Sequence, residues 1–283
     1  MRAGRIRVDG GELETGWWGP GPTQAATLVL LHEGLGSVAL WRDVPELLSA
    51  ATGWGVFAYS RFGYGDSAAA RLPRPMTYMH HEAEVVLPQV LRVAGIRRSV
   101  LVGHSDGGSI AAIYAALGDA GLGHAGLGHG ASGDVGPALL GPALLGLVTI
   151  AAHFFVEDVN VASIRGIRTE YESGALRQRL ARYHRDVEVA FRGWNDAWLD
   201  PRFRDFDITE RLGGIRVPIL ALQGEADPYG SAEQLQVFAA HARAPIETGL
   251  IAGARHSPHL EAKEATLAAI AGFIATLERG AST

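Results

Sequence analysis

The stretch Leu101–Ile110, LVGHSDGGSI, decides the fold. A single serine, Ser105, lies between Gly103 and Gly107 in the pattern Gly-x-Ser-x-Gly. An apolar segment precedes this pattern and a helix-forming segment follows it, which is the strand–turn–helix context of a nucleophile elbow. In so tight a turn, a Cβ at either glycine would collide with neighbouring strands. We therefore interpret Ser105 as a nucleophile, with a purely structural tight turn as the alternative.

The composition limits the classes of protein to which the chain can belong. Its 283 residues, of which 47% are hydrophobic and 19% charged, suffice for one large domain or for a core domain with an insertion. The net charge of -5 leaves no basic surplus for nucleic acid, so we expect no nucleic-acid partner. The chain has no cysteine, which excludes disulfides, thiolate metal sites and a cysteine nucleophile.

The amino-terminal region bears on location. Charged residues and glycines interrupt the apolar positions among the first twenty residues, so this region lacks the continuous apolar stretch of a signal peptide. No apolar run of membrane-spanning length follows. We therefore expect a cytoplasmic protein with no membrane partner.

Apolar runs bounded by glycine alternate with helical stretches, which predicts a mostly parallel sheet with helices on both faces. A turn at Asp9–Gly11 predicts an antiparallel hairpin at one edge of that sheet. Further strands are predicted at Thr27–Leu31, Gly55–Tyr59, Ser99–Val102, Leu147–Ala151, Pro218–Leu222 and Thr248–Ile251. Helices are predicted at Leu40–Ala50, His80–Ala94, Gly108–Leu117 and Lys263–Leu277. The predicted fold class is therefore α/β.

Two segments interrupt this alternation. Residues 153–214 are rich in aromatic and charged side chains, and we interpret them as a helical cap, or lid, on a core made of residues 1–152 and 215–283. Residues 118–146 contain two tandem duplications, AGLGH and GPALL, and are interpreted as a low-complexity insert far from Ser105. The histidines of the insert, His124 and His129, lack carboxylate or cysteine companions, so we predict a solvated loop and no metal site. The apolar GPALL repeats leave homo-oligomer formation open.

A serine nucleophile needs a base beside it and a third group that orients the base. In this context the expected chain order is serine, acid, histidine. Asp227 and His256 each follow a predicted strand closely, so both lie past the carboxyl end of a strand. We predict Asp227 as the acid, with Glu225 as the alternative, and His256 as the base. His259, one turn further on, is expected to pack or to cap the final helix.

The oxygen that becomes negative during acyl transfer needs two aimed N–H donors. We predict the backbone N–H of Asp106 as one donor and that of Gly34, in the loop HEGLGS at residues 32–37, as the other. As an alternative role, the side chain of Glu33 holds this loop in place. The carboxylate of Asp106 is expected to point outward, toward the amino end of the following helix, where a negative charge is stabilising.

Five segments together carry a resemblance: LLHEGLGS, SRFGYGDS, GHSDGG, QGEADPYG and ARHSPHLE, in this order and spacing. They resemble the alpha/beta-hydrolase fold family, and specifically its lidded serine hydrolases, over nearly the whole chain except the duplicated insert and, loosely, the lid. The resemblance implies a mostly parallel eight-stranded sheet, a helical cap inserted after strand six, and a triad of Ser105, Asp227 and His256. It also implies that the chain uses no cofactor.

The chain departs from the family pattern near the expected oxyanion site. Glu33 stands where the common His-Gly-x-x-Gly loop has a glycine, so a carboxylate lies at the rim of that site. Ser60 replaces the aspartate that usually precedes the next Gly-x-Gly loop, and Arg61 follows it. We hypothesise that an ion pair between Arg61 and Glu33 neutralises the acid.

These residues favour a serine hydrolase of the carboxylesterase type, which cleaves a small ester or lactone through an acyl-enzyme. A carbon–carbon bond hydrolase that acts on diketone-like ring-cleavage products shares the triad and is the main alternative; thioesterase and acyltransferase activities stay open. A non-catalytic small-molecule binding protein on the same fold is the alternative from another class, although a complete triad disfavours it.

Substrate choice is expected to depend on the lid. The candidates for an apolar substrate pocket are aromatic residues of this segment: Phe154, Phe155, Trp194 and Trp198. Their alternative role is packing in the lid's own core. His153 and Glu33 are further pocket candidates. Arg192 and Arg202 are candidates for binding a substrate carboxylate, with a solvated surface as the alternative.

Overall fold

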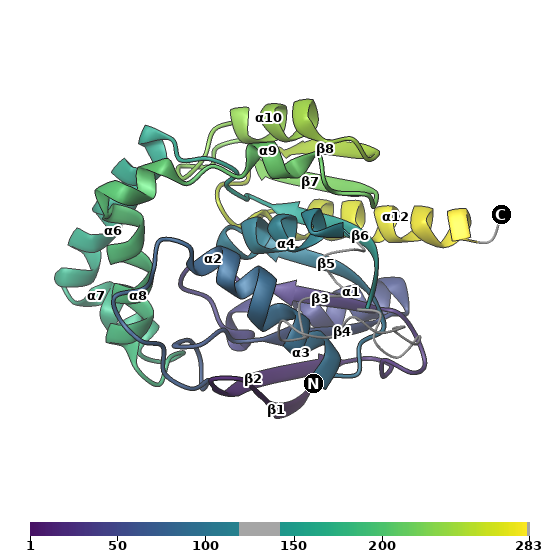
Figure 1. Cartoon of the computed structure of the whole chain (residues 1–283), viewed down its shortest axis with the longest axis horizontal. Helices are drawn as coiled ribbons and strands as arrows, with labels where there is room; N and C mark the ends of the chain where they lie inside the picture. Colours follow the sequence, from purple (N-terminus) through teal and green to yellow (C-terminus); the bar gives the residue numbers. More distant parts are fainter. Residues whose placement is uncertain (119–141, 282–283) are drawn as a thin grey trace, which may run out of the picture.

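The computed structural model describes residues 1–118 and 142–281. Within these residues the strands form one eight-stranded sheet in the order β1-β2-β4-β3-β5-β6-β7-β8, with helices packed around it (Figure 1). The strands are β1 Arg2–Val8, β2 Gly11–Trp18, β3 Thr27–Leu31, β4 Gly55–Tyr59, β5 Arg98–His104, β6 Ala143–Ile150, β7 Ile219–Gly224 and β8 Ile246–Ile251. The predicted α/β fold is confirmed.

The sheet is antiparallel at one edge and parallel elsewhere. β1 pairs with β2 as a hairpin, and Gly10 closes it with a φ of 98°, a conformation that favours glycine. β2 pairs antiparallel with β4, and the remaining pairs from β4 to β8 are parallel. The predicted edge hairpin and parallel strands are therefore both present, and the carboxyl ends of β5, β7 and β8 meet at one edge of the molecule.

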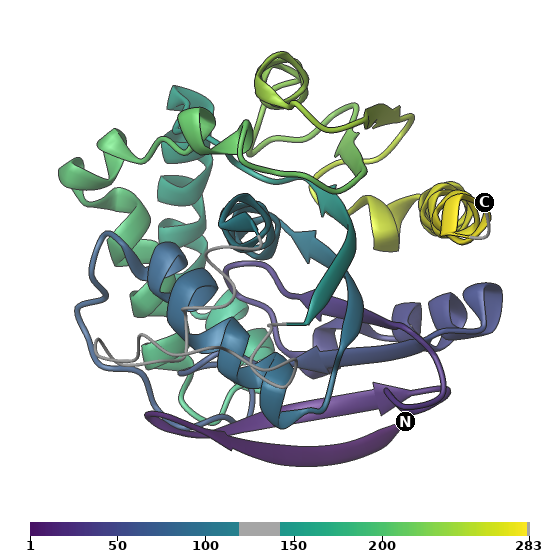
Figure 2. The same cartoon turned by 45° about the vertical axis from the view of Figure 1, so that its right-hand side comes forward.

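Helices cover both faces of the sheet, because alternate strand residues face opposite sides. Leu28 and Leu30 of β3 pack with α1 Val44–Thr52 and α12 Lys263–Ala281. Val29 and Leu31 belong to the core on the other face, with helices such as α3 Leu87–Val93, α4 Asp106–Ala116 and α10 Glu233–His241. Figure 2 shows α1 and α12 on one side of the sheet and α3 and α4 on the other.

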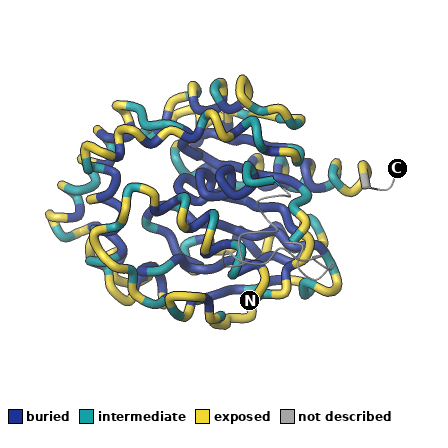
Figure 3. Tube along the Cα trace, in the orientation of Figure 1, coloured by how far each residue is buried: buried dark blue, intermediate teal, exposed yellow. Residues whose placement is uncertain are grey.

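The helices α2 Tyr78–His81, η2 Glu82–Val86 and α3 run in succession toward β5, and η1 Val38–Trp41 precedes α1. They match the predicted helical segments at residues 40–50 and 80–94 closely. The short helix α11 Pro258–Glu261 separates β8 from α12 and carries His259. The inner strands β3, β4, β5 and β7 and the helix α4 are buried almost throughout, whereas the edge strands β1 and β8 are mostly exposed or half-buried. The surrounding helices alternate buried and exposed residues (Figure 3).

One boundary differs from the prediction. The insert was expected to extend over residues 118–146, but Ala143 pairs with Arg98 and Leu144 with Ser99, so β6 begins at Ala143. The second GPALL copy therefore leads directly into an apolar strand, and its last residues are part of the sheet. The first duplication, with His124 and His129, lies outside the described residues.

The residues between β6 and β7 are mainly helical. They contain α6 Asp158–Glu172, α7 Ala175–Leu180, α8 Val187–Leu199, η4 Pro201–Asp205 and α9 Thr209–Leu212. α6 and α8 pack together through the stacked rings of Tyr171 and Phe191, whose centroids lie 3.6 Å apart. α6, α7 and α8 lie together beyond one end of the sheet (Figure 1). We propose that residues 153–214 form the cap.

No helix in the described part of the chain has the length and hydropathy of a membrane span.

Candidate active site

Ser105 lies in a strained turn between β5 and α4. Its φ of 52° and ψ of -121° place a non-glycine residue in a backbone region that L residues rarely adopt. A Cβ at Gly103 would overlap the carbonyl of Gly107, and a Cβ at Gly107 would overlap the carbonyl of Leu31. The Gly-x-Ser-x-Gly pattern therefore satisfies a steric requirement of this turn. Ser105 is only 6% exposed.

A continuous chain of hydrogen-bonding groups joins Ser105 to His256 and Asp227. The Oγ of Ser105 lies 3.0 Å from Nε2 of His256, and Nδ1 of His256 lies 2.9 Å from both carboxylate oxygens of Asp227. Because a carboxylate only accepts hydrogen bonds, Nδ1 carries the hydrogen and Nε2 is left to accept from the serine hydroxyl. This arrangement can remove a proton from Ser105 as its oxygen attacks an acyl group.

Two other residues fix the carboxylate of Asp227. Gln223, the second-last residue of β7, donates through Nε2 to Oδ2 at 2.6 Å, and the backbone N–H of Tyr229 donates to Oδ1 at 2.8 Å. Burial raises the pKa of Asp227, but its hydrogen bond and electrostatic interaction with His256 outweigh burial, so the pKa lies below its ordinary value. The acid is therefore held ionised and oriented toward His256.

The structure distinguishes the predicted acid from its alternative. Glu225 is exposed, and its carboxylate accepts from the backbone N–H of Gly253 at 3.4 Å rather than from His256. His259 is buried between the rings of His104 and Trp41, with centroid distances of 4.5 and 5.1 Å. It packs in α11, ahead of the final helix.

The expected position of the Asp106 carboxylate is wrong. Asp106 does begin α4, but it is 0% exposed and does not point outward. Tyr78 donates its hydroxyl to Oδ2 at 2.6 Å, and Nε1 of Trp198 lies 3.2 Å from Oδ1. The buried charge is therefore stabilised by two donors in addition to the amino end of the helix. Neither donor was foreseen, because each is remote in sequence.

The hypothesis of an ion pair between Arg61 and Glu33 is also wrong. The guanidinium of Arg61 donates to the backbone carbonyls of His32 and Glu33, the second at 2.9 Å. Arg61 thus secures the backbone of the loop on which Gly34 lies. The carboxylate of Glu33 instead faces His104, with 3.6 Å between Oε2 and Nδ1.

Helix α8 covers both residues that are expected to stabilise the oxyanion. A Cβ at Gly34 would collide with the indole of Trp194, and Trp198, one turn later, contacts Asp106. His153 follows β6, and its ring lies 5.2 Å from Trp198 and 5.8 Å from His256. Trp198 and His153 thus lie beside Asp106 and His256, and Trp194 lies against Gly34.

The other pocket candidates lie elsewhere. Phe154 is buried against Phe238 of α10, with a centroid distance of 4.3 Å, which favours a packing role. Arg192 pairs with Glu188 and Asp196 of its own helix, and Arg202 pairs with Asp200 at 2.7 Å. Neither arginine is directed at the triad by these contacts.

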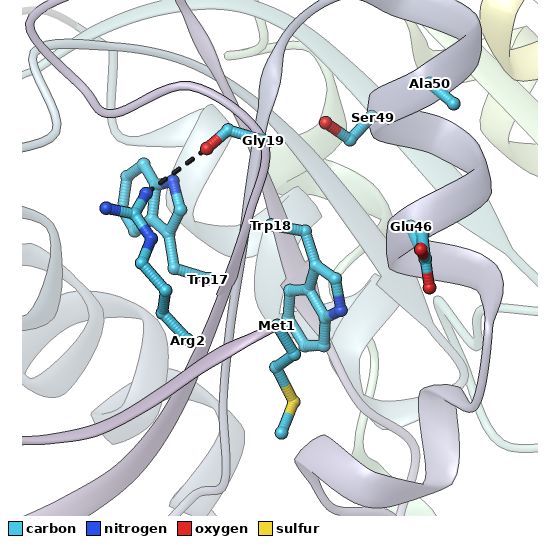
Figure 4. Close-up of a pocket in the computed structure, with 8 residues that line it drawn as sticks. All are labelled: Met1, Arg2, Trp17, Trp18, Gly19, Glu46, Ser49 and Ala50. Atoms are coloured by element: carbon cyan, nitrogen blue, oxygen red, sulfur yellow. Dashed lines mark hydrogen bonds between the residues drawn. The ribbon is translucent and has the colours of Figure 1, made fainter.

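A cavity of about 320 Å³ lies away from this site, between β2 and α1 (Figure 4). Trp17, Trp18 and Glu46 are among its lining residues, and Arg2 donates to the carbonyl of Gly19 beside it. None of its lining residues belongs to the predicted triad or oxyanion site. Among the described residues, no group of three or more histidine and acidic side chains could hold a metal ion.

Comparisons with known proteins bear on the family and the fold of the chain. The model of the alpha/beta hydrolase family matches residues 28–269. No curated protein sequence matches the chain.

Solved structures share the fold at low sequence identity. A bacterial membrane phospholipase A is 20% identical, with a TM-score of 0.71, and the match covers 98% of this chain and 86% of that one. The enol-lactonase from Burkholderia xenovorans LB400 is 18% identical, with a TM-score of 0.68 and coverage of 96% and 100%. A thermophilic esterase from Thermogutta terrifontis is 17% identical, with a TM-score of 0.67 and coverage of 98% and 99%.

Proposed function

The chain belongs to the alpha/beta hydrolase family, and we propose that it is a serine hydrolase that cleaves a small carboxylic ester or lactone. The observation that carries this proposal is the hydrogen-bonded arrangement of Ser105, His256 and Asp227 on a nucleophile turn with a φ of 52°. We further propose that the protein is located in the cytoplasm.

The reaction begins when Oγ of Ser105 attacks the carbonyl carbon and its proton passes to Nε2 of His256. Asp227 holds Nδ1 and stabilises the imidazolium that forms. The backbone N–H groups of Gly34 and Asp106 are the proposed donors to the oxyanion. His256 then returns the proton to the leaving alcohol as the carbon–oxygen bond breaks, which leaves an acyl group on Ser105.

Water completes the cycle. His256 takes a proton from a water molecule, the water oxygen attacks the acyl carbon, and the bond to Oγ breaks as Ser105 regains its proton. For a lactone the leaving alcohol belongs to the same molecule as the acid, so the product is a single hydroxy acid. The chemistry of the residues is the same in both cases.

A substrate panel tests the proposal. It should contain activated esters of increasing acyl length, lactones of several ring sizes, and a diketone-like substrate for carbon–carbon bond cleavage. We expect the native protein to turn over an ester or a lactone. The turnover rate should fall by about four to six orders of magnitude in Ser105→Ala and by roughly four orders of magnitude in Asp227→Asn. Glu225→Gln is the matched control, because Glu225 does not contact His256, and it should retain activity. Preferential cleavage of the diketone would replace ester hydrolysis by carbon–carbon bond hydrolysis.

A further inference from the structure

His104 immediately precedes the nucleophile and contacts the backbone of the proposed base. Its Nε2 lies 2.7 Å from the carbonyl oxygen of His256. A carbonyl oxygen only accepts, so Nε2 of His104 carries a hydrogen and donates it. One side chain at the end of β5 therefore holds the loop that carries His256, at a position adjacent to Ser105.

The other nitrogen of this ring faces an acid. Nδ1 of His104 has no hydrogen-bond partner in the structure, and the carboxylate oxygen Oε2 of Glu33 lies 3.6 Å away. If Nδ1 carried only a lone pair, two acceptors would face each other in a site where the His104 side chain is 2% exposed. A hydrogen on Nδ1 makes the contact attractive, and the ring then carries a hydrogen on both nitrogens.

The His104 side chain is enclosed, and the Glu33 side chain, 30% exposed, packs against its own loop. A Cβ at Gly36 would overlap the carboxylate of Glu33, so the glycine leaves room for the acid to fold back over its own loop. The ring of His259 packs edge-on against His104, with centroids 4.5 Å apart, and the ring of His256 lies 5.2 Å away. Glu33, His256 and His259 are the ionisable groups whose contacts with His104 the structure gives, and only Glu33 among them is acidic.

We propose that Glu33 and His104 form a positioning pair for the base: Glu33 keeps a hydrogen on Nδ1 of His104, and Nε2 of His104 holds the carbonyl of His256. The pair thereby connects three loops of the proposed active site, namely the oxyanion loop, the nucleophile turn and the histidine loop. Its catalytic consequence rests on the proposed serine hydrolase function, because it acts by holding Ser105 and His256 at their 3.0 Å separation.

The ionisation of Glu33 agrees with this arrangement. Burial raises the pKa of Glu33, but the contact with His104 and the charge of that ring outweigh burial and hold the pKa well below its ordinary value. Glu33 is therefore a carboxylate over the range in which the protein would work. Glu33 and His104 are positioning residues, since neither contacts the reacting atoms.

The first test reads the hydrogens on the ring directly and does not depend on activity. Nitrogen-15 NMR of histidine-labelled protein should show one imidazole with hydrogens on both nitrogens. That signal should be lost in His104→Gln, which assigns it, and in Glu33→Gln. Persistence of the signal in Glu33→Gln, or its absence from the native protein, would overturn the pairing.

The second test measures the catalytic consequence as the rate of reaction with a fluorophosphonate. Glu33→Gln should slow this reaction on the order of tenfold, since small misplacements of a catalytic group are costly, and in substrate turnover the loss should fall on kcat rather than KM. In a His104→Gln background, where a side-chain amide can still donate to the carbonyl of His256, Glu33→Gln should change the rate by less than about twofold.

The controls separate the two proposals. Glu225→Gln removes a nearby exposed carboxylate and should leave the rate unchanged. An unchanged rate in Glu33→Gln would refute the positioning role while native labelling still supported a serine hydrolase. Failure of the folded native protein to react would refute the hydrolase function, and the NMR test would still report on the pair.

Discussion

Removal of the Tyr78 hydroxyl should destabilise the protein, because this group stabilises a buried charge. Tyr78 is 6% exposed and donates to Oδ2 of Asp106, which is 0% exposed, at 2.6 Å. Burial and the charge of Asp106 raise the pKa of Tyr78 well above its ordinary value, so the hydroxyl keeps its hydrogen. A hydrogen bond to a charged group contributes about 1.5–3 kcal/mol. We therefore expect Tyr78→Phe to lower the free energy of unfolding by roughly 2 kcal/mol.

Urea denaturation followed by tryptophan fluorescence measures this change. Tyr183→Phe is the matched control, because Tyr183 is 39% exposed, and it should change stability by less than about 0.5 kcal/mol. The cost of Tyr78→Phe should fall to about 1 kcal/mol in an Asp106→Asn background, where the acceptor is neutral. A loss below about 0.5 kcal/mol in Tyr78→Phe alone would refute the reasoning that this bond stabilises the Asp106 charge.

Two further predictions concern the turn and the histidines. Gly107→Ala should lower the free energy of unfolding by about 3 kcal/mol or prevent folding, because the new Cβ would overlap the carbonyl of Leu31. Gly166→Ala, on the open surface of α6, should be neutral or slightly stabilising. Thermal melts followed by circular dichroism compare the two variants, and equal stability would contradict the steric explanation. Burial, together with the electrostatic interaction with His256, lowers the pKa of His153 to about 4. In the unfolded chain the pKa of a histidine is near 6.5, so the unfolded chain binds more protons between these two values. The free energy of unfolding should therefore fall as the pH drops from about 6.5 to 4. His153→Gln should reduce that loss of stability by up to roughly 3 kcal/mol. Urea denaturation at a series of pH values measures it in both proteins, and an identical loss would show that His153 is not buried in its neutral form.

Local patterns were enough to predict the fold. Each predicted strand corresponds to an observed one, because buried parallel strands are continuous apolar runs and glycines mark their ends. The Gly-x-Ser-x-Gly turn is recognisable for a similar reason, since two glycines are required within five residues. Asp227 and His256 were predicted as partners from their places after β7 and β8, and the structure brings both to Ser105; their catalytic roles stay predictions.

The partners of the buried charges could not be predicted in this way. Tyr78 and Trp198 lie 28 and 92 positions from Asp106, and no periodic pattern links residues so far apart. Charge alone suggested Arg61 for Glu33, but the arginine is occupied by backbone carbonyls of the same loop. The packing of α8 onto the sheet edge and the return of the Glu33 carboxylate toward His104 decide these contacts, and both are tertiary.

Intact-mass spectrometry after treatment with a fluorophosphonate tests the central claim, that Ser105 is a nucleophile activated by His256, most directly. The native chain should gain one adduct, and Ser105→Ala and His256→Ala, checked for folding by circular dichroism, should gain none. An absence of adduct on folded native protein, or an adduct that persists in Ser105→Ala, would contradict the claim.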